Sequence, residues 1–200
     1  MRCALVLAAA LGAAPLAVPA AAASAGADPG LTGAPAGGGL AAEGNCTACH
    51  TGSPLNPDAA GRIEILGLPE RYRPGERYVL ELRLAHPDAS RARWGFQLTA
   101  LSPRTMQGAG ELVVVDEVAT QRIDGGPGGR QYLEHTQEGT APGRTGEQRW
   151  KFAWVAPSAA AGEVAFFGGG NAANADGSNQ GDWIFNPTPA PIATVRGPAD

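Results

Sequence analysis

The chain has 200 residues and a formal net charge of −4 at pH 7, with 15 basic residues against 19 acidic ones. This balance excludes a protein that binds nucleic acid through a basic face, so we expect no nucleic-acid partner. Hydrophobic residues make up 44% of the chain, which is enough to bury a core and excludes wholesale disorder. The 29 glycines and 17 prolines disfavour helix interiors. Composition therefore predicts an all-β or loop-rich globular protein.

Residues 1–25 have the pattern of a secretory signal peptide. Arg2 precedes an apolar stretch, and Ala23, Ser24 and Ala25 form an A-x-A cleavage pattern. Two prolines interrupt the stretch and no basic residues follow it, which favours cleavage over a transmembrane anchor. We therefore predict an exported protein, periplasmic, secreted or at the cell surface, with no membrane span after cleavage.

The rest of the chain divides into three parts by composition. Residues 26–42 are rich in Gly, Ala and Pro and almost uncharged, which is typical of a flexible spacer. Residues 43–61 contain both cysteines that remain after cleavage, and residues 62–196 carry strand-like patterns. We expect a cysteine-containing segment followed by one folded domain.

The cysteine-containing segment reads Cys46-Thr47-Ala48-Cys49-His50. Positions i and i+3 share a face of a short helical turn, so both thiols can form thioethers with the two vinyl groups of one haem. The spacing C-x-x-C-H is the c-type haem attachment signal. The sequence therefore predicts one covalent haem c per chain, bound by Cys46 and Cys49, with His50 as the proximal ligand of the haem iron.

The two cysteines also allow a redox pair, a zinc site or a local disulfide. A thioredoxin-like pair needs a strand before it and a long helix after it, and the Gly- and Pro-containing flanks offer neither. A zinc site needs four ligands, and no second pair is at hand. A local disulfide beside a bystander histidine stays open, although such a small loop would stabilise the fold little.

Three residues are candidates for the second axial position of a haem iron. His86 precedes Pro87 and Asp88, a turn signature that predicts an exposed loop residue. His135 follows a short strand-like stretch and could point inward, whereas Met106 lies in a predicted loop, where a thioether ligand would raise the potential. We prefer His135 to Met106, and an open or water-bound site is the remaining alternative.

From residue 62 onward the hydrophobic pattern has a period of two. Residues 78–84, 94–100 and 149–154 alternate apolar and polar side chains, the pattern of half-buried strands. Shorter strand-like runs occupy residues 111–119, 163–167, 182–185 and 192–195, with Gly- and Pro-containing turns between them. Seven to nine short strands predict an immunoglobulin-like antiparallel β-sandwich with most aromatic residues directed inward.

Residues 168–182 are predicted to form a loop that is rich in oxygen-bearing side chains. These side chains suggest a calcium site, but their spacing does not match a D-x-[DN]-x-[DN]-G loop. Tight turns use the same residue types, so calcium is the weaker interpretation. The residues concerned are Asn171, Asn174, Asp176, Asn179 and Asp182.

Five stretches in order, residues 46–52, 72–78, 94–101, 129–136 and 168–182, closely resemble the bacterial choice-of-anchor V domain. That domain is similar to the Reeler domain, an extracellular β-sandwich of reelin-like proteins. The resemblance covers about residues 43–185 and implies a secreted or cell-surface bacterial β-sandwich with a haem motif. The family's Glu-His-Thr stretch falls on residues 134–136, which favours His135. The family's apolar anchoring tail has no counterpart here, so we expect a soluble periplasmic or secreted form.

Together these features predict an exported monohaem c-type cytochrome-like protein that transfers single electrons to a redox partner protein. The alternative is an extracellular Reeler-like binding or adhesion module whose C-x-x-C is a local disulfide. A haem-dependent peroxidase or sensor is a weaker third interpretation, because it requires an open sixth site. The sequence designates no catalytic residues and offers no paired-carboxylate or Ser-His-Asp arrangement for a hydrolase.

Overall fold

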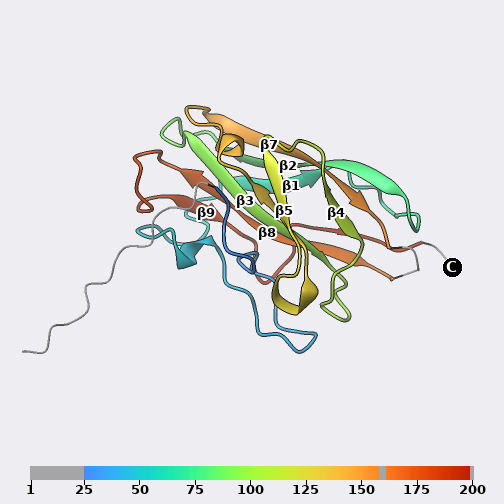
Figure 1. The fold of residues 1–200 in the computed structure, drawn as a ribbon. Helices are drawn as coiled ribbons and strands as arrows, with labels where there is room; N and C mark the ends of the chain where they lie inside the picture. The colour runs from blue at the N-terminus through green and yellow to red at the C-terminus, as the bar shows by residue number, and fades with distance from the viewer. Residues whose placement is uncertain (1–24, 158–160, 199–200) are drawn as a thin grey trace, which may run out of the picture.

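The computed structural model describes residues 25–157 and 161–198. They form two antiparallel sheets packed face to face (Figure 1), which confirms the predicted all-β sandwich. One sheet has the strand order β1-β2-β7-β4, and the other has the order β10-β8-β3-β6-β5 with β9 paired to β8. The strands are β1 Arg62–Leu66, β2 Arg77–His86, β3 Arg93–Leu101, β4 Glu111–Val114, β5 Thr120–Ile123, β6 Tyr132–His135, β7 Gly146–Val155, β8 Val164–Ala173, β9 Trp183–Phe185 and β10 Ala193–Val195.

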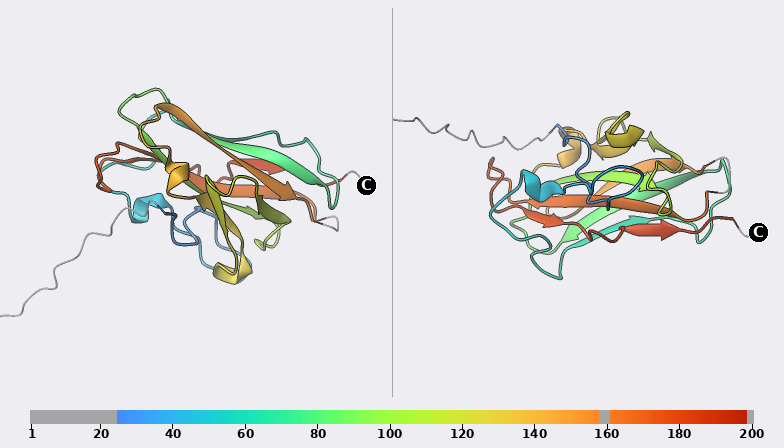
Figure 2. Two further views of the ribbon diagram at one scale, coloured as in Figure 1. Left: turned by 45° about the horizontal axis from the view of Figure 1, so that its top comes forward. Right: turned by 90° about the horizontal axis from the view of Figure 1, so that it is seen from below.

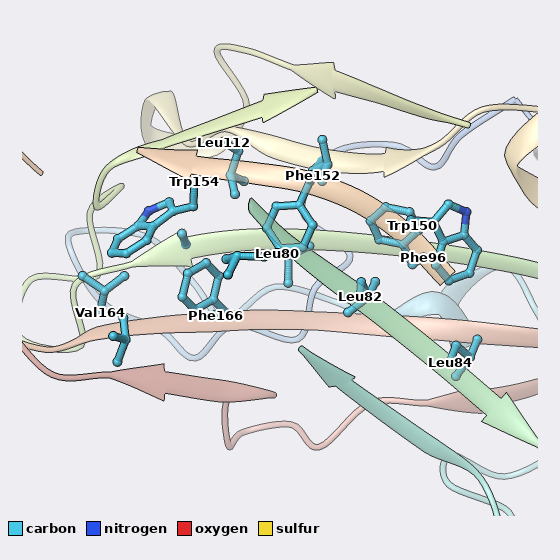
Figure 3. Close-up of a cluster of buried hydrophobic side chains, with 14 of the residues drawn as sticks. Leu80, Leu82, Leu84, Phe96, Leu112, Trp150, Phe152, Trp154, Val164 and Phe166 are labelled. Carbon is cyan, nitrogen blue, oxygen red and sulfur yellow. The ribbon is translucent and has the colours of Figure 1, made fainter. Parts of the chain in front are cut away.

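The core lies between the two sheets and follows from the alternation in the sequence. Leu80, Leu82 and Leu84 of β2 are at most 1% exposed, because residues two apart on a strand share a face. Facing side chains from β3, β7 and β8, among them Trp150 and Phe166, complete the cluster (Figure 3). The predicted inward direction of these residues is confirmed.

Two predicted segments differ from the observed elements. The strand expected over 111–119 ends at Val114, because the Asp116 carboxylate accepts hydrogen bonds from the N–H groups of Val118 and Ala119 and forms a turn. The loop expected over 168–182 begins later, since β8 continues to residue 173. Its glycines are required by close packing: a Cβ on Gly170 would lie 2.7 Å from Leu84 Cδ2 of the other sheet.

Residues 26–42 are packed against the domain, unlike the flexible spacer that their composition suggests. Ala34 is fully buried in a second cluster with Leu101 of β3 and Phe167 of β8. Leu101 and Phe167 alternate with core residues, so this cluster lies on the outer face of the second sheet. Figure 2 shows the blue segment against this face. Small residues pack closely here because they let the backbone approach the sheet.

His86 is a correction to the sequence analysis, which placed it in an exposed loop. It ends β2 and is 3% exposed. Its Nε2 lies 3.0 Å from Asp58 Oδ2, its Nδ1 accepts the Asp88 N–H at 3.0 Å, and its ring stacks on Phe185. The turn after His86 is real, but the ring folds back onto the sheet to bury its apolar surface.

Candidate functional site

A pocket of about 390 Å³ lies on the outer face of the second sheet, at the end nearest the C-x-x-C-H segment. Its floor is formed by outward-facing positions of β3 and β8, where Arg93 pairs with Ala173 and Gly95 pairs with Asn171. Three segments form its walls: residues 27–31, the cysteine-containing turn and the connection from β8 to β9. The other lining residues are Ala27, Asp28, Leu31, Cys46, Cys49, His50, Trp94, Phe96, Gln97, His135, Thr140, Ala175, Gly177, Ser178 and Asp182.

The two cysteines lie on a single 3-10 turn, Cys46–Ala48. The Asn45 side chain caps this turn by accepting the Thr47 N–H at 2.9 Å, and the His50 N–H donates to the Cys46 carbonyl at 2.9 Å. Both thiols are free and half-buried. Desolvation raises the pKa of the Cys46 thiol to about 12, so this thiol is protonated at neutral pH.

The connection between β8 and β9 holds this turn in place through the backbone. The Asn179 side chain donates to the Cys49 carbonyl at 2.7 Å. The Thr51 N–H donates to the Asn179 carbonyl, and the Gly181 N–H donates to the Thr51 carbonyl, each at 2.8 Å. The cysteine-containing turn is therefore fixed to the second sheet rather than hanging from it.

His50 is oriented by a buried carboxylate. Its Nδ1 lies 2.6 Å from Asp182 Oδ2, and Asp182 is 2% exposed. The Asn174 N–H donates to the other carboxylate oxygen at 3.1 Å. Because a carboxylate accepts hydrogen bonds, Nδ1 carries the proton and Nε2 is the nitrogen suited to bind a metal. The Asn171 amide nitrogen lies 3.4 Å from this Nε2.

His135 reaches the same pocket from β6. Its Nδ1 lies 3.0 Å from the Phe96 backbone nitrogen and 3.1 Å from the Phe96 carbonyl oxygen. The imidazole lies over Gly95, where a Cβ would be 2.9 Å from His135 Cε1. A glycine on β3 therefore makes room for the ring.

Solved structures with a similar fold include Reeler domains. The Reelin-N domain of F-spondin matches with a TM-score of 0.50 and 21% identity, over 77% of this chain and 96% of that domain. This chain has a Reeler-like β-sandwich fold. A human F-spondin reeler domain gives a TM-score of 0.48 at 21% identity, over 74% of this chain and 94% of that one. No protein-family model and no curated protein matches the sequence.

On this Reeler-like fold, four of the six residues considered for haem binding line one pocket: Cys46, Cys49, His50 and His135. Met106 lies elsewhere, in the cluster with Ala34, and its carbonyl accepts Arg130 Nη2 at 2.9 Å. The described residues include no helix that is long and apolar enough to cross a membrane.

The residues considered for calcium have other contacts. Asp182 orients His50, Asn179 holds Cys49, and Asn174 donates to Asp176 Oδ2 at 3.1 Å. Within residues 25–157 and 161–198, no group of three or more His, Cys, Asp or Glu side chains is placed to hold a metal ion. The contacts of Asp182 and Asn171 with His50 were not predicted from the sequence. The one sequence feature that pointed to these two residues was the enrichment of Asn and Asp in residues 168–182.

Proposed function

We propose that this chain is an exported monohaem c-type cytochrome-like protein of the bacterial choice-of-anchor V type, which passes single electrons to a redox partner protein. One observation carries the proposal: the C-x-x-C-H residues and His135, from distant parts of the sequence, line the same pocket. His135 lies on β6, far along the chain from the cysteine-containing turn, and its place in the same pocket supports a shared ligand.

The residues of this pocket fit a haem group. A volume of about 390 Å³ lies within the usual range of roughly 300–1,000 Å³ for ligand pockets. Both thiols are free for thioether bonds. The Oδ1 atom of Asn171 is buried in the pocket wall without a hydrogen-bond partner among the described residues, as expected where a ligand completes the site.

When bound, haem supplies an iron that alternates between ferric and ferrous states and so carries one electron. Cys46 and Cys49 would each add an S–H bond across a vinyl group, with sulfur bonded to one vinyl carbon and hydrogen to the other, so the addition needs no oxidant. His50 would bind the iron through Nε2 because Asp182 holds Nδ1, and the carboxylate makes the imidazole a stronger donor. His135 would supply a second protein ligand to the iron.

Arg93 adds a cation at the pocket floor. Its Nε donates to Thr140 Oγ1 at 3.1 Å, and the side chain lines the pocket. Guanidinium groups bind carboxylates strongly, so Arg93 would pair with a haem propionate.

Covalent haem is the first test. The chain is expressed with the c-type cytochrome maturation system in an exporting bacterium. A reduced-minus-oxidised spectrum of the purified protein detects haem, and haem staining after denaturing electrophoresis shows whether the haem is covalently bound. We expect covalent haem in the natural chain and in the control Thr47→Ser, and complete loss of it in Cys46→Ser/Cys49→Ser. A natural chain that exports and folds but carries no covalent haem overturns the proposal.

The second candidate is an extracellular Reeler-like binding module, and the β-sandwich fold supports it. In that case Cys46 and Cys49 form a local disulfide in the exported protein. Thiol titration under denaturing conditions, with and without reductant, distinguishes the two: the module hides two thiols until reduction, whereas haem attachment consumes both permanently.

Asp182→Asn is expected to raise the reduction potential of the haem form. A neutral amide at Nδ1 makes the His50 imidazole a weaker electron donor than the carboxylate does, so the ferric state of the iron is less stabilised. Loss of a residue that hydrogen-bonds to a metal ligand typically lowers the affinity for the metal 10- to 100-fold. Applied to ferric iron, this factor corresponds to a shift in reduction potential of about 60–120 mV for one electron. Potentiometric titration measures the shift. An unchanged potential would show that the contact between Asp182 and His50 does not act on the iron.

A further inference from the structure

Glu134 is a buried carboxylate on the outer face of β6, beside the pocket. It is 2% exposed. The hydrogen-bond donors that reach it from the described residues are uncharged amides: the Ala27 N–H at 3.0 Å, Gln97 Nε2 at 3.1 Å and Gln121 Nε2 at 2.9 Å. Burying a charged group is costly unless the group is paired with an opposite charge, and none of these donors is charged.

Gly26 lies directly on this carboxylate. A Cβ at this position would overlap Glu134 Oε1 and the Gln121 side-chain nitrogen, and its φ of +120° disfavours other residues. The Gly26 backbone therefore lies beside Glu134, and the next residue, Ala27, donates its N–H to the same carboxylate. The A-x-A pattern places signal-peptide cleavage between Ala25 and Gly26, which makes Gly26 the first residue of the mature chain.

We propose that cleavage after Ala25 creates a new ion pair, in which the α-ammonium group of Gly26 binds the buried carboxylate of Glu134. Signal peptidase adds one water molecule across this peptide bond: Ala25 leaves as a carboxylate, and the Gly26 nitrogen becomes an amine that is protonated at neutral pH. The hydrogen bond from Gln121 to the Ala25 carbonyl, 2.5 Å in the uncleaved chain, is lost with the leader. The Gln121 amide then keeps its hydrogen bonds to Glu134 Oε1 at 2.9 Å and to the His135 carbonyl at 3.5 Å.

The ion pair fixes one wall of the pocket. Gln97 donates to the Asp28 carbonyl at 3.0 Å and accepts the Leu31 N–H at 2.8 Å, so residues 27–31 follow the position of Gly26. Two other titratable groups lie near the new ammonium: Asp28, whose charge raises the pKa of Glu134, and the adjacent His135. Cleavage thus supplies a cation to the buried carboxylate and thereby fixes this wall of the pocket, independently of whether the pocket holds haem.

The test starts from the exported protein. Mass spectrometry of the intact chain is expected to find Gly26 as its first residue, and any other first residue overturns the proposal. NMR titration of the α-amino group is then expected to show a pKa about one unit or more above the usual ~7.7–8.0. Glu134→Gln should return this pKa to the usual range, whereas Glu117→Gln, at an exposed position, should leave it raised.

A stability cycle provides a second measurement. Lys151 is the single lysine of the chain, so in Lys151→Arg the α-amino group is the one amine left to acetylate. Acetylation is expected to lower Tm in this protein and to change it much less when Glu134→Gln is also present. The difference between the two changes in Tm reports the interaction between the α-ammonium group and Glu134. Equal losses of Tm with and without the Glu134 carboxylate, together with an ordinary α-amino pKa, would refute the ion pair.

Discussion

Glu43→Ala is expected to lower the free energy of unfolding by about 3–5 kcal/mol, because it leaves the Arg130 guanidinium buried without its counter-ion. The two side chains are 4% and 0% exposed, and Glu43 Oε1 accepts Arg130 Nη1 at 2.5 Å. The same carboxylate accepts the Tyr132 hydroxyl at 2.6 Å and the Thr32 hydroxyl at 2.5 Å. Three strong hydrogen bonds are therefore lost with one side chain.

Urea denaturation followed by tryptophan fluorescence measures this loss. Glu70→Ala is the matched control, since Glu70 pairs with Arg196 at 3.2 Å but both side chains are more than half exposed. Exposed pairs of this kind contribute about 0–1 kcal/mol. A Glu43→Ala protein as stable as the Glu70→Ala protein would show that Arg130 finds solvent or another partner once Glu43 is gone.

His135→Met is expected to raise the reduction potential of the haem form and to change its visible spectrum. A thioether donates less charge to ferric iron than an imidazole does, and axial ligands set the haem potential over a range of roughly 0.8 V. His135 lines the pocket and lies over Gly95, so a flexible methionine can occupy the same space. His135→Ala, which offers no ligand, should give a spectrum that responds to added imidazole.

Spectroscopy and potentiometry on covalently loaded protein distinguish ligation from packing. The control is Met106→Leu, which changes a residue outside the pocket in the cluster with Ala34. It should leave both spectrum and potential unchanged. If His135→Met and His135→Ala behave like Met106→Leu, His135 is a packing residue and the iron has another sixth ligand or none.

The core could be predicted from sequence because a strict alternation of apolar and polar residues, as in β2, indicates a strand with one buried face. The floor of the pocket could not, because the Gly- and Asn-rich sequence of β8 resembles a loop, although its glycines are closely packed in the sheet. The C-x-x-C-H motif identified three pocket residues through chemistry that depends on local spacing alone. Asp182 could not be assigned in this way, because its contact with His50 joins positions far apart in sequence.

The second sheet separates the hydrophobic core from the pocket. Trp150, Phe166 and their neighbours fill the inner side, while the pocket lies on the outer side, bounded by Gly95 and Asn171. The hydrophobic core is therefore complete before any cofactor arrives. Folding and loading become separate events, so the empty protein is expected to persist as a stable species that can be purified, stored and filled later, and its pocket can be redesigned without altering the packing that holds the domain together.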